Sequence, residues 1–341
     1  MRRLIIFLTL FVAAAALLSC VDQPEKTLEL EADKTEVVAD GEDHVTFKVT
    51  YTFTDVEDVT SKADITCLSG DAVVTDGVFT PEEEGTYVFK ASYDGVESSQ
   101  VEITVTKPEP SHFQKHTCIM EFTGGWCSQC PEGATTLNYL VGKAYKDKAF
   151  ALAFHNADPL SIPQEQILFK KFRLGGYPAY VTDMRDSGLL NEGTCGKTVD
   201  ASLYEHPTHC GVAVNCTYDA ASKEVTVNAS LYSEKTSQYS FAVYVVEDKV
   251  KGSQTLSTGE VQDDYVHRHV VRMMLSSDVT GDALGSITAG EEAKKTYTFK
   301  MDDKWNIENV SVAVLAIDSS AEVNNMATCA ADGGKTEYEL I

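Results

Sequence analysis

A strand-like run of residues that leads into two cysteines spaced three apart is the feature that most constrains the fold of this chain. Residues 117–131 read Thr-Cys-Ile-Met-Glu-Phe-Thr-Gly-Gly-Trp-Cys-Ser-Gln-Cys-Pro. We expect a buried strand over 117–122, a turn that carries Cys127 and Cys130, and an amphipathic helix over 128–146. At the start of a helix, unpaired backbone N–H groups lower the pKa of a thiol. Cys127 is therefore the expected attacking thiol, and Cys130 the shielded thiol that resolves the mixed disulfide.

The pattern continues as alternating strands and helices. Residues 150–154 form a continuous apolar run, which is typical of a strand buried on both faces. A second helix is expected from Ser161 to about Phe172, and a Gly-Gly pair closes it. A further strand begins at Tyr180, and a third helix is expected over 198–204. This order predicts an α/β segment around the two cysteines.

These residues resemble the thioredoxin superfamily. Trp126 matches the tryptophan that precedes the cysteine pair, and Glu121 occupies the place of a buried acid in that family. The resemblance implies that Glu121 relays the proton of Cys130; the alternative is that Glu121 is ordinary surface charge. The resemblance also implies a cis proline that faces the disulfide and shapes a groove for an extended peptide. Pro178, which follows Tyr177, is the well-placed residue for that role.

The cysteine pair has other interpretations. Half of a zinc site has the same spacing, but none of the later cysteines supplies a second close pair of ligands. Glu132 lies beside the pair and opposes formation of a thiolate. A structural disulfide in a fold without turnover therefore stays open as the alternative to a redox-active centre.

Histidines near the ends of strands are the remaining polar candidates. His155 and Asp158 follow the buried strand and could tune Cys127, or they could be ordinary turn residues. His267 and His269 would share one face of a strand, which is compatible with a metal. Packed or solvated side chains explain these two histidines more simply, and we expect neither a metal nor another cofactor.

The amino-terminal residues have the pattern of an export signal. Three residues with two arginines precede an apolar run over 4–18, and Cys20 follows a small residue at the expected cleavage point. Residues 1–19 are therefore a predicted lipoprotein signal peptide, and Cys20 should carry acyl chains that hold the protein to a membrane. An uncleaved transmembrane anchor is the alternative, although the run is short for one. The signal predicts an oxidising cell envelope, in which disulfides persist.

The rest of the chain divides by its patterns. A short tether is followed by alternating strands and glycine turns, which predict an all-β sandwich similar to bacterial immunoglobulin-like modules. A proline-containing linker leads to the thioredoxin-like segment, after which strand patterns predict an antiparallel β-sandwich. The predicted class is thus a multi-domain α+β protein. Its parts are the tether 20–26, the immunoglobulin-like sandwich 27–106, the linker 107–113, the thioredoxin-like domain 114–206 and the C-terminal sandwich 207–341.

Charge and the remaining cysteines set further limits. The formal net charge of −24 excludes binding to nucleic acid phosphates. Cys210 and Cys216 are six residues apart on one predicted strand, so roughly 20 Å separates them and they cannot bond each other. The pairing of the other cysteines stays open from sequence alone. These are Cys67, Cys118, Cys195, Cys210, Cys216 and Cys329.

One resemblance rests on several separate runs of residues, which are 120–131, Ala153-Phe154-His155, Gly176-Tyr177-Pro178, Val246-Glu247-Asp248, Gln254 and 265–272. Together they resemble the outer-membrane-protein-twenty-eight-related family of Gram-negative lipoproteins. The resemblance runs over about residues 115–330, and the first sandwich is an addition to it. It implies an outer-membrane lipoprotein, and it leaves surface exposure and the activity open.

Two functions follow as hypotheses. The first is thiol–disulfide exchange on envelope or surface proteins, in which Cys127 attacks and Cys130 resolves. The second is a non-catalytic surface protein that binds or adheres and uses the same fold as a scaffold. The direction of any exchange, as oxidant, reductant or isomerase, cannot be read from the residues.

Overall fold

A computed structural model describes residues 25–41, 43–107 and 110–341. The predicted signal peptide, Cys20 and most of the tether lie outside the described residues, as do two residues of the predicted linker. In the described part of the chain, no helix is long and apolar enough to cross a membrane. The chain divides into two compact units, Met1–Glu109 and Pro110–Ile341.

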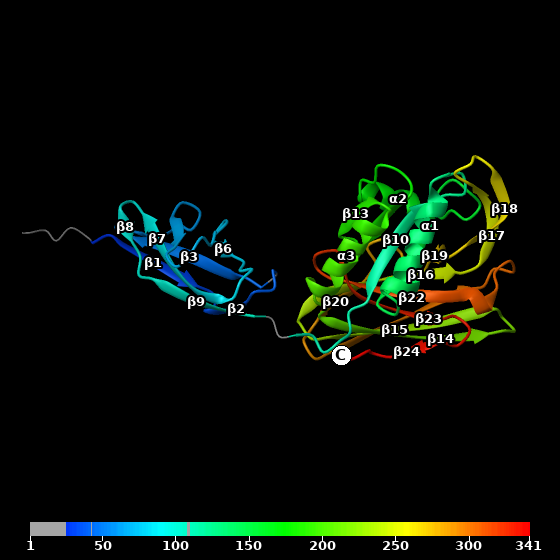
Figure 1. The fold of residues 1–341 in the computed structure, drawn as a ribbon. Coiled ribbons are helices and arrows are strands. Elements are labelled where there is room, and N and C mark those ends of the chain that lie inside the picture. Colours follow the sequence, from blue (N-terminus) through cyan, green and yellow to red (C-terminus); the bar gives the residue numbers. More distant parts are fainter. Residues whose placement is uncertain (1–24, 42, 108–109) are drawn as a thin grey trace, which may run out of the picture. The chain divides into compact units, whose positions relative to one another are not determined.

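The first unit consists of short strands in two sheets around one apolar core (Figure 1). One sheet has the order β1-β3-β4 with β6 beside β3, and the other has the order β2-β9-β7-β5 with β8 beside β7. Alternate side chains of β3 point inward, and Phe47 of β3 meets Phe89 of β7 with ring centroids 4.9 Å apart. The alternating strands predicted for 27–106 are therefore observed. The strands are β1 Thr27–Ala32, β2 Glu36–Val38, β3 Val45–Thr52, β4 Val56–Asp58, β5 Asp64–Cys67, β6 Val78–Phe79, β7 Gly85–Tyr93, β8 Val96–Glu97 and β9 Val101–Thr106.

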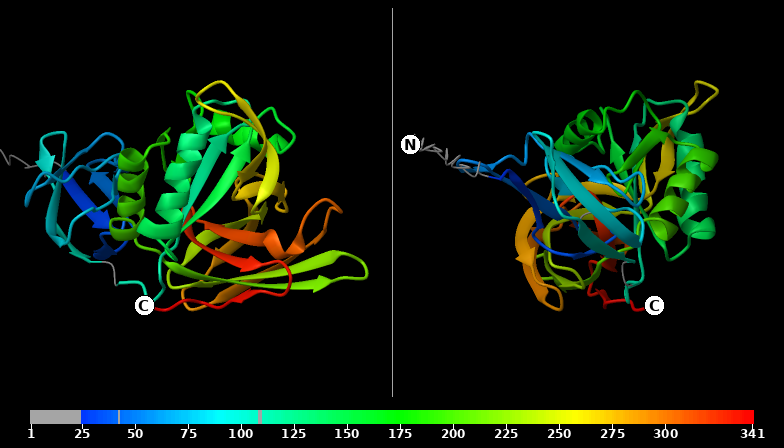
Figure 2. Two further views of the ribbon diagram at one scale, coloured as in Figure 1. Left: turned by 45° about the vertical axis from the view of Figure 1, so that its right-hand side comes forward. Right: turned by 90° about the vertical axis from the view of Figure 1, so that its left-hand side faces the viewer.

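The second unit begins with the α/β segment and continues with strands (Figures 1 and 2). Its first elements are β10 Thr117–Thr123, α1 Cys130–Tyr139, the π-helix η1 Leu140–Ala144, β11 Ala149–His155, α2 Pro163–Lys171, β12 Ala179–Thr182, β13 Asp186–Leu189 and α3 Glu192–Tyr204. Its later elements are β14 Cys210–Asp219, β15 Glu224–Ser233, β16 Ser237–Glu247, β17 Val250–Thr255, β18 Val261–His267, β19 Val270–Met274, β20 Asp282–Ile287, β21 Glu292–Lys300, the short helix η2 Ile307–Asn309, β22 Val310–Ile317, β23 Val323–Ala330 and β24 Lys335–Thr336. The described chain is thus a mostly-β protein with several sheets and few helices.

One sheet of nine strands unites this second unit. Its order is β13-β12-β10-β11-β19-β16-β22-β23, and β20 pairs with β16. β10 and β11 are parallel, whereas β12 runs antiparallel to β10. β11 also pairs with β19, where Ala153 is opposite Val270. The predicted boundary at 206/207 therefore falls inside one compact unit, because strands from both sides of it share this sheet.

Packing on this sheet explains its apolar strands. Leu137 of α1 and Val199 of α3 pack with Ile119 on one face of β10, while Leu168 of α2 packs on the other face with Phe122. Farther along, β16 and β22 pack against a second sheet with the order β21-β15-β14-β24. Because both faces are covered, neighbouring residues along β16 are buried alike.

Two helices differ in extent from the prediction. The expected helix over 128–146 begins only at Cys130, with a proline in its first turn, and passes into the π-helix at Leu140. The expected helix over 198–204 begins earlier, at Glu192, because the Asn191 side chain accepts the N–H of Thr194 at 3.0 Å and caps the helix. Such a cap depends on one polar side chain, so the spacing of apolar residues does not indicate where this helix begins.

Candidate functional site

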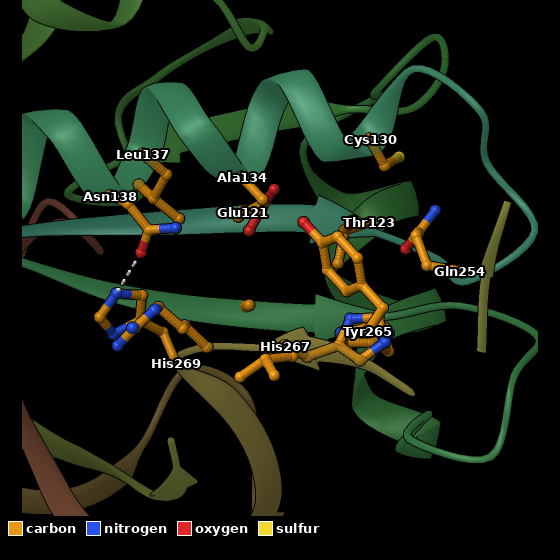
Figure 3. Close-up of a pocket in the computed structure, with 14 residues that line it drawn as sticks. Glu121, Thr123, Cys130, Ala134, Leu137, Asn138, Gln254, Tyr265, His267 and His269 are labelled. Atoms are coloured by element: carbon orange, nitrogen blue, oxygen red, sulfur yellow. Dashed lines mark hydrogen bonds between the residues drawn. The ribbon is translucent and has the colours of Figure 1, made fainter. Parts of the chain in front are cut away.

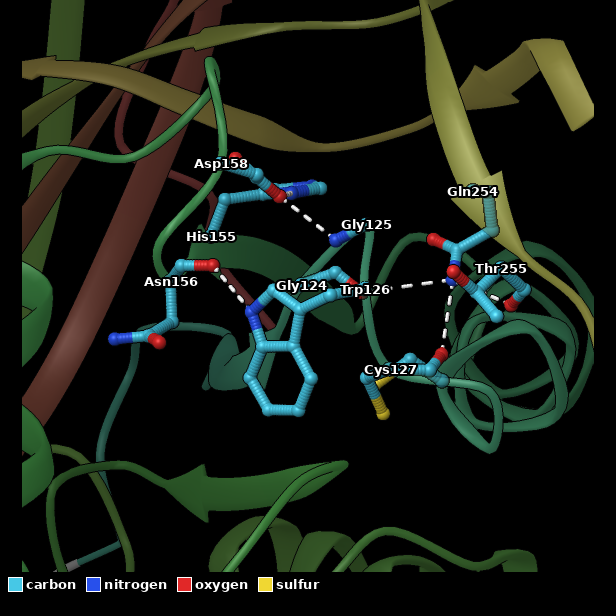
Figure 4. Close-up of a disulfide and its surroundings, with 10 residues drawn as sticks. Gly124, Gly125, Trp126, Cys127, His155, Asn156, Asp158, Gln254 and Thr255 are labelled. Atoms are coloured by element: carbon cyan, nitrogen blue, oxygen red, sulfur yellow. Dashed lines mark hydrogen bonds and ion pairs between the residues drawn. A yellow bond between two sulfur atoms is a disulfide. The ribbon is translucent and has the colours of Figure 1, made fainter. Parts of the chain in front are cut away.

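The two cysteines of the turn form a disulfide. β10 ends at Thr123, α1 begins at Cys130, and the intervening turn carries Cys127 (Figure 4). The Cys127–Cys130 bond joins Cα atoms 5.4 Å apart, so the pairing predicted from the spacing is confirmed. Cys127 is 6 % exposed and Cys130 is 1 % exposed. Both cysteines are therefore buried, and Cys127 is the more exposed of the two.

Pro178 packs against the helix that Cys130 begins. The Tyr177–Pro178 peptide bond is cis, as predicted. A Cβ atom added to Gly133 in α1 would lie 2.8 Å from the Cβ of Pro178, so the helix and the proline ring touch with no room for a side chain. This contact places Pro178 one turn along the helix from the disulfide. Its role in binding an extended peptide stays a prediction.

A buried carboxylate, which sequence reasoning missed, connects the proline to the turn. Glu165 of α2 is 1 % exposed. Its Oε1 accepts a hydrogen bond from the Tyr177 hydroxyl at 2.7 Å, and its Oε2 accepts one from the Asn156 amide at 2.8 Å. The backbone oxygen of Asn156 in turn accepts the indole N–H of Trp126 at 2.8 Å. These hydrogen bonds link Tyr177, which precedes Pro178, to Trp126, which precedes Cys127, through Glu165 of α2.

Asp158 fixes the backbone of the turn. Its Oδ2 accepts the N–H of Gly125 at 2.8 Å and lies 2.7 Å from Nδ1 of His155 (Figure 4). Burial opposes the charged form of Asp158, but the hydrogen bonds from His155 and from backbone N–H groups outweigh it and lower its pKa. The sequence prediction linked both residues to Cys127. In the structure, Asp158 is linked to the cysteine turn by the hydrogen bond from the N–H of Gly125, and His155 is linked to the turn through Asp158.

The β17–β18 hairpin closes over the cysteine turn. The side-chain amide of Gln254 donates to the backbone oxygen of Cys127 at 2.9 Å, and the N–H of Thr255 donates to the oxygen of Gly125 at 2.7 Å. A Cβ atom on Gly125 would lie 2.5 Å from the backbone oxygen of Ser253, so this position needs glycine. Gln254 itself is buried. The family resemblance is the signal in the sequence that indicates Gln254, because nothing near it in the chain points to the cysteines.

Glu121 lies in a small buried pocket beside the disulfide (Figure 3). It is 3 % exposed, and its Oε1 has no hydrogen-bond partner. The alternative of an exposed surface charge is therefore wrong. Burial raises its pKa to about 8. Burial, followed by the charge of Glu121, also raises the pKa of Tyr265, whose hydroxyl points toward Glu121 in Figure 3. The residues that define this pocket of about 20 Å³ include Glu121, Cys130, His155, Gln254, Tyr265 and His267.

The two later histidines do not share a strand face. β18 ends at His267, and His269 adopts a φ of 55° in the following turn, which corrects the prediction. His269 lies within hydrogen-bond distance of Asn138, at 3.2 Å. Burial, and next the neighbouring His155, lower the pKa of His267 to about 4, so it is neutral at physiological pH. In the described part of the chain, no three His, Cys, Asp or Glu side chains are grouped to hold a metal.

Comparison with known proteins identifies a family over part of the chain. Residues 165–332 match the family described as outer membrane protein Omp28. This segment begins after the disulfide and includes Pro178, Gln254 and Tyr265. No curated protein matches the chain.

Two solved structures are similar to different degrees. HBP35 of Porphyromonas gingivalis matches with a TM-score of 0.55 and 23 % identity, covering 68 % of this chain and 81 % of that one. At this level of sequence identity, the similarity shows the fold alone. The structure of surface layer protein SbsC, domains 4–9, has a TM-score of 0.20 and 11 % identity, and covers 89 % of this chain and 50 % of that one.

Proposed function

Over residues 165–332 the chain belongs to the outer membrane protein Omp28 family, and from this premise we propose that it exchanges disulfides with proteins of the cell envelope. The observation that carries the proposal is the Cys127–Cys130 disulfide at the start of α1, with Glu121 buried in the adjoining pocket. A reactive sulfur pair and a proton carrier are the two parts that such an exchange needs.

The arrangement of elements supports a thioredoxin-like identity for the first part of the second unit. The chain order is β10, the cysteine turn, α1, β11, α2, the cis Pro178, β12, β13 and α3. The four strands lie in the order β11-β10-β12-β13. The sequence resemblance predicts the same order of strand, cysteine turn, helix and cis proline. The immunoglobulin-like identity of the first unit is proposed on its two packed sheets alone.

The exchange begins from the disulfide form. A thiolate of the partner attacks Sγ of Cys127, the Cys127–Cys130 bond breaks, and Cys130 leaves as a thiolate. Because the pKa of Glu121 is about 8, its carboxyl group carries a proton at neutral pH and can pass it to Cys130. A second partner thiolate then attacks the partner sulfur of the mixed disulfide and releases Cys127 as a thiolate, which takes up a proton from water. The partner has lost two electrons to a new disulfide, and the pair has become a dithiol.

Surroundings of the disulfide favour attack at one sulfur. Trp126 is 49 % exposed, and its ring meets that of Tyr177 edge to face, with centroids 5.4 Å apart. Trp126 precedes Cys127 and Tyr177 precedes Pro178 in the chain, whereas the side-chain amide of Gln254 in the β17–β18 hairpin donates to the backbone oxygen of Cys127. An extended segment of the partner would therefore approach along the side of Trp126 and Pro178.

Trapping with a defined disulfide tests the proposal. The reduced full-length Cys130→Ser variant is incubated with oxidised glutathione, and intact mass is measured. We expect one glutathione bound at Cys127, because the resolving thiol is absent. A Cys127→Ser variant is the matched control and should gain none, because Cys130 is shielded. Both variants also carry Cys67→Ala, since Cys67 is a partly exposed free thiol that could gain glutathione itself. Absence of the adduct in both variants, or equal adducts in both, would contradict the proposed exchange.

A second candidate is a non-catalytic binding protein that keeps this disulfide for structure. The observation in its favour is the low exposure of Cys127 beneath the hairpin, which restricts access to the sulfur. Mild treatment of the folded protein with dithiothreitol distinguishes the two. Reduction of Cys127–Cys130 without unfolding supports exchange, and resistance up to the unfolding transition supports the binding protein.

Attachment to the membrane through Cys20 remains part of the proposal. The family is one of outer membrane proteins, and the predicted signal ends at this cysteine. Acyl chains on Cys20 would hold both units at the membrane surface, where envelope or surface proteins are the partners. Intact mass of the mature protein, with Cys20→Ala as the control, tests this point.

A further inference from the structure

A second pair of cysteines lies between the two large sheets of the second unit. Cys216 is on β14 of the four-stranded sheet, and Cys329 is on β23 of the nine-stranded sheet. Their Sγ atoms are 2.7 Å apart, although the residues are separated by 113 positions in the sequence. Cys216 is 1 % exposed and Cys329 is 6 % exposed. Two sulfurs at this distance lie in closer contact than ordinary packing gives and within reach of a bond of about 2.05 Å.

The strands around the pair hold the two sulfurs face to face. Cys216 is opposite Val227 of β15 within its own sheet, and Cys329 is opposite Val312 of β22 within the other. All four residues belong to the apolar core between the sheets. No charged partner stabilises a thiolate there, and the neighbouring sulfur, followed by burial, raises the pKa of Cys329. Free thiols at this place would be inert once the sheets have closed over them.

The other cysteines of the described chain have different surroundings. Cys210 is on the same strand as Cys216, but its sulfur lies 3.4 Å from Oδ1 of Asn324. Cys118 and Cys195 belong to the two other cores of the unit, and Cys67 belongs to the first unit. Cys216 and Cys329 are therefore the remaining pair that the fold brings together.

We propose that Cys216 and Cys329 form a structural disulfide that joins the two sheets. An oxidised dithiol protein of the envelope supplies the oxidising equivalents. One cysteine attacks its disulfide as a thiolate, and the second then attacks the mixed bond. The new bond takes the place of two S–H bonds, and the two protons and two electrons leave with the oxidant, which becomes a dithiol. Because the sulfurs are buried in the folded unit, this step precedes closure of the sheets.

Thiol mapping of the full-length protein tests the bond. The protein from the envelope is denatured without reductant, treated with N-ethylmaleimide, digested and analysed by mass spectrometry. We expect a cross-linked peptide that joins the segments of Cys216 and Cys329, with Cys118, Cys195 and Cys210 alkylated. A Cys210→Ala variant should give the same link, which separates Cys210 from Cys216 when both occur in one peptide. Alkylation of both Cys216 and Cys329 in the unreduced protein would overturn the proposal.

Thermal unfolding provides a second measurement that does not depend on the exchange activity. The background is a variant in which Cys127 and Cys130 are both alanine, so that one structural bond remains to be reduced. Unfolding with a phosphine reductant present should lower the melting temperature by roughly 5–15 °C, since a long loop is released. The same comparison in a variant that also lacks Cys216 and Cys329 should give no shift. An equal shift in both variants would contradict the bond.

Discussion

The two cysteine pairs of the second unit lie in opposite surroundings. Cys127 and Cys130 stand where a helix begins, beside a buried carboxyl group. Cys216 and Cys329 face each other between two apolar sheets. Cys127 and Cys329 are equally exposed, at 6 %, so exposure does not distinguish the two pairs. The first surroundings supply a group that can carry a proton, and the apolar second surroundings do not. The comparison indicates that the polarity of the surroundings, rather than the closeness of two sulfurs, sets the two pairs apart.

The largest expected effect concerns Glu121, which accompanies only the first pair. Its ordinary pKa is 4.5, and in the fold it is about 8. Between these values the unfolded chain loses the proton and the folded chain keeps it, so stability falls as pH rises. Glu121→Gln removes this penalty. The variant should equal the wild type near pH 4 and exceed it by at most about 5 kcal/mol at pH 9.

Denaturant unfolding at the two pH values measures that difference. Reduction of Cys127–Cys130 in the variant should also lose its pH dependence near 8, whereas Cys216 and Cys329 should not respond. Equal stability of the two proteins at pH 9 would show that Glu121 finds a partner in the fold and is not the proton carrier proposed above.

A smaller effect is expected where the helix touches the cis proline. Gly133→Val adds a side chain at a place with no free space next to Pro178. Overpacking of this kind costs about 1–3 kcal/mol, and displacement of Pro178 should slow exchange through Cys127. Gly142→Ala, which meets no atom within 4 Å, is the control. If Gly133→Val exchanges disulfides as fast as the control, the proline does not shape the partner's approach.

The smallest effect is expected at the hairpin that covers the first pair. Gln254→Ala removes the side-chain donor to the backbone oxygen of Cys127, which keeps the N–H of Cys130 at 3.2 Å, and should destabilise the fold by about 1–2 kcal/mol. Gln262, which is opposite Gln254 in the hairpin and exposed, is the control, and Gln262→Ala should stay within about 0.5 kcal/mol of the wild type. Faster reduction of Cys127–Cys130 in the first variant alone is expected. Equal rates of Cys127–Cys130 reduction in the two variants would show that the hairpin does not control access to this disulfide.

Local patterns predicted the parts of the site that are close together in sequence. The spacing of Cys127 and Cys130 and the apolar run before them were sufficient for the strand, the turn and the helix. Pro178 was found because the family resemblance implies a cis proline after the second helix. In these places the chemistry depends on a few adjacent residues, and a single sequence contains them.

Contacts between distant segments could not be predicted. Glu165 appears as an ordinary acidic residue in a helix, and its two buried hydrogen bonds come from residues 9 and 12 positions away. Gln254 reaches Cys127 across 127 positions. The approach of Cys216 to Cys329 depends on how two sheets pack. Strand patterns show which side chains alternate, and they do not show which strands become neighbours.

The pairing of β11 with β19 has a practical consequence for anyone who wishes to work on a smaller piece. A fragment ending near residue 206 would retain both sulfurs of the first pair, but it would lose the strand opposite Ala153 and the hairpin above Cys127. β11 would then be an unpaired edge strand, which could pair edge to edge with other chains and form aggregates. The part of this unit that carries the Cys127–Cys130 disulfide and the part made of later strands should therefore be expressed and purified together.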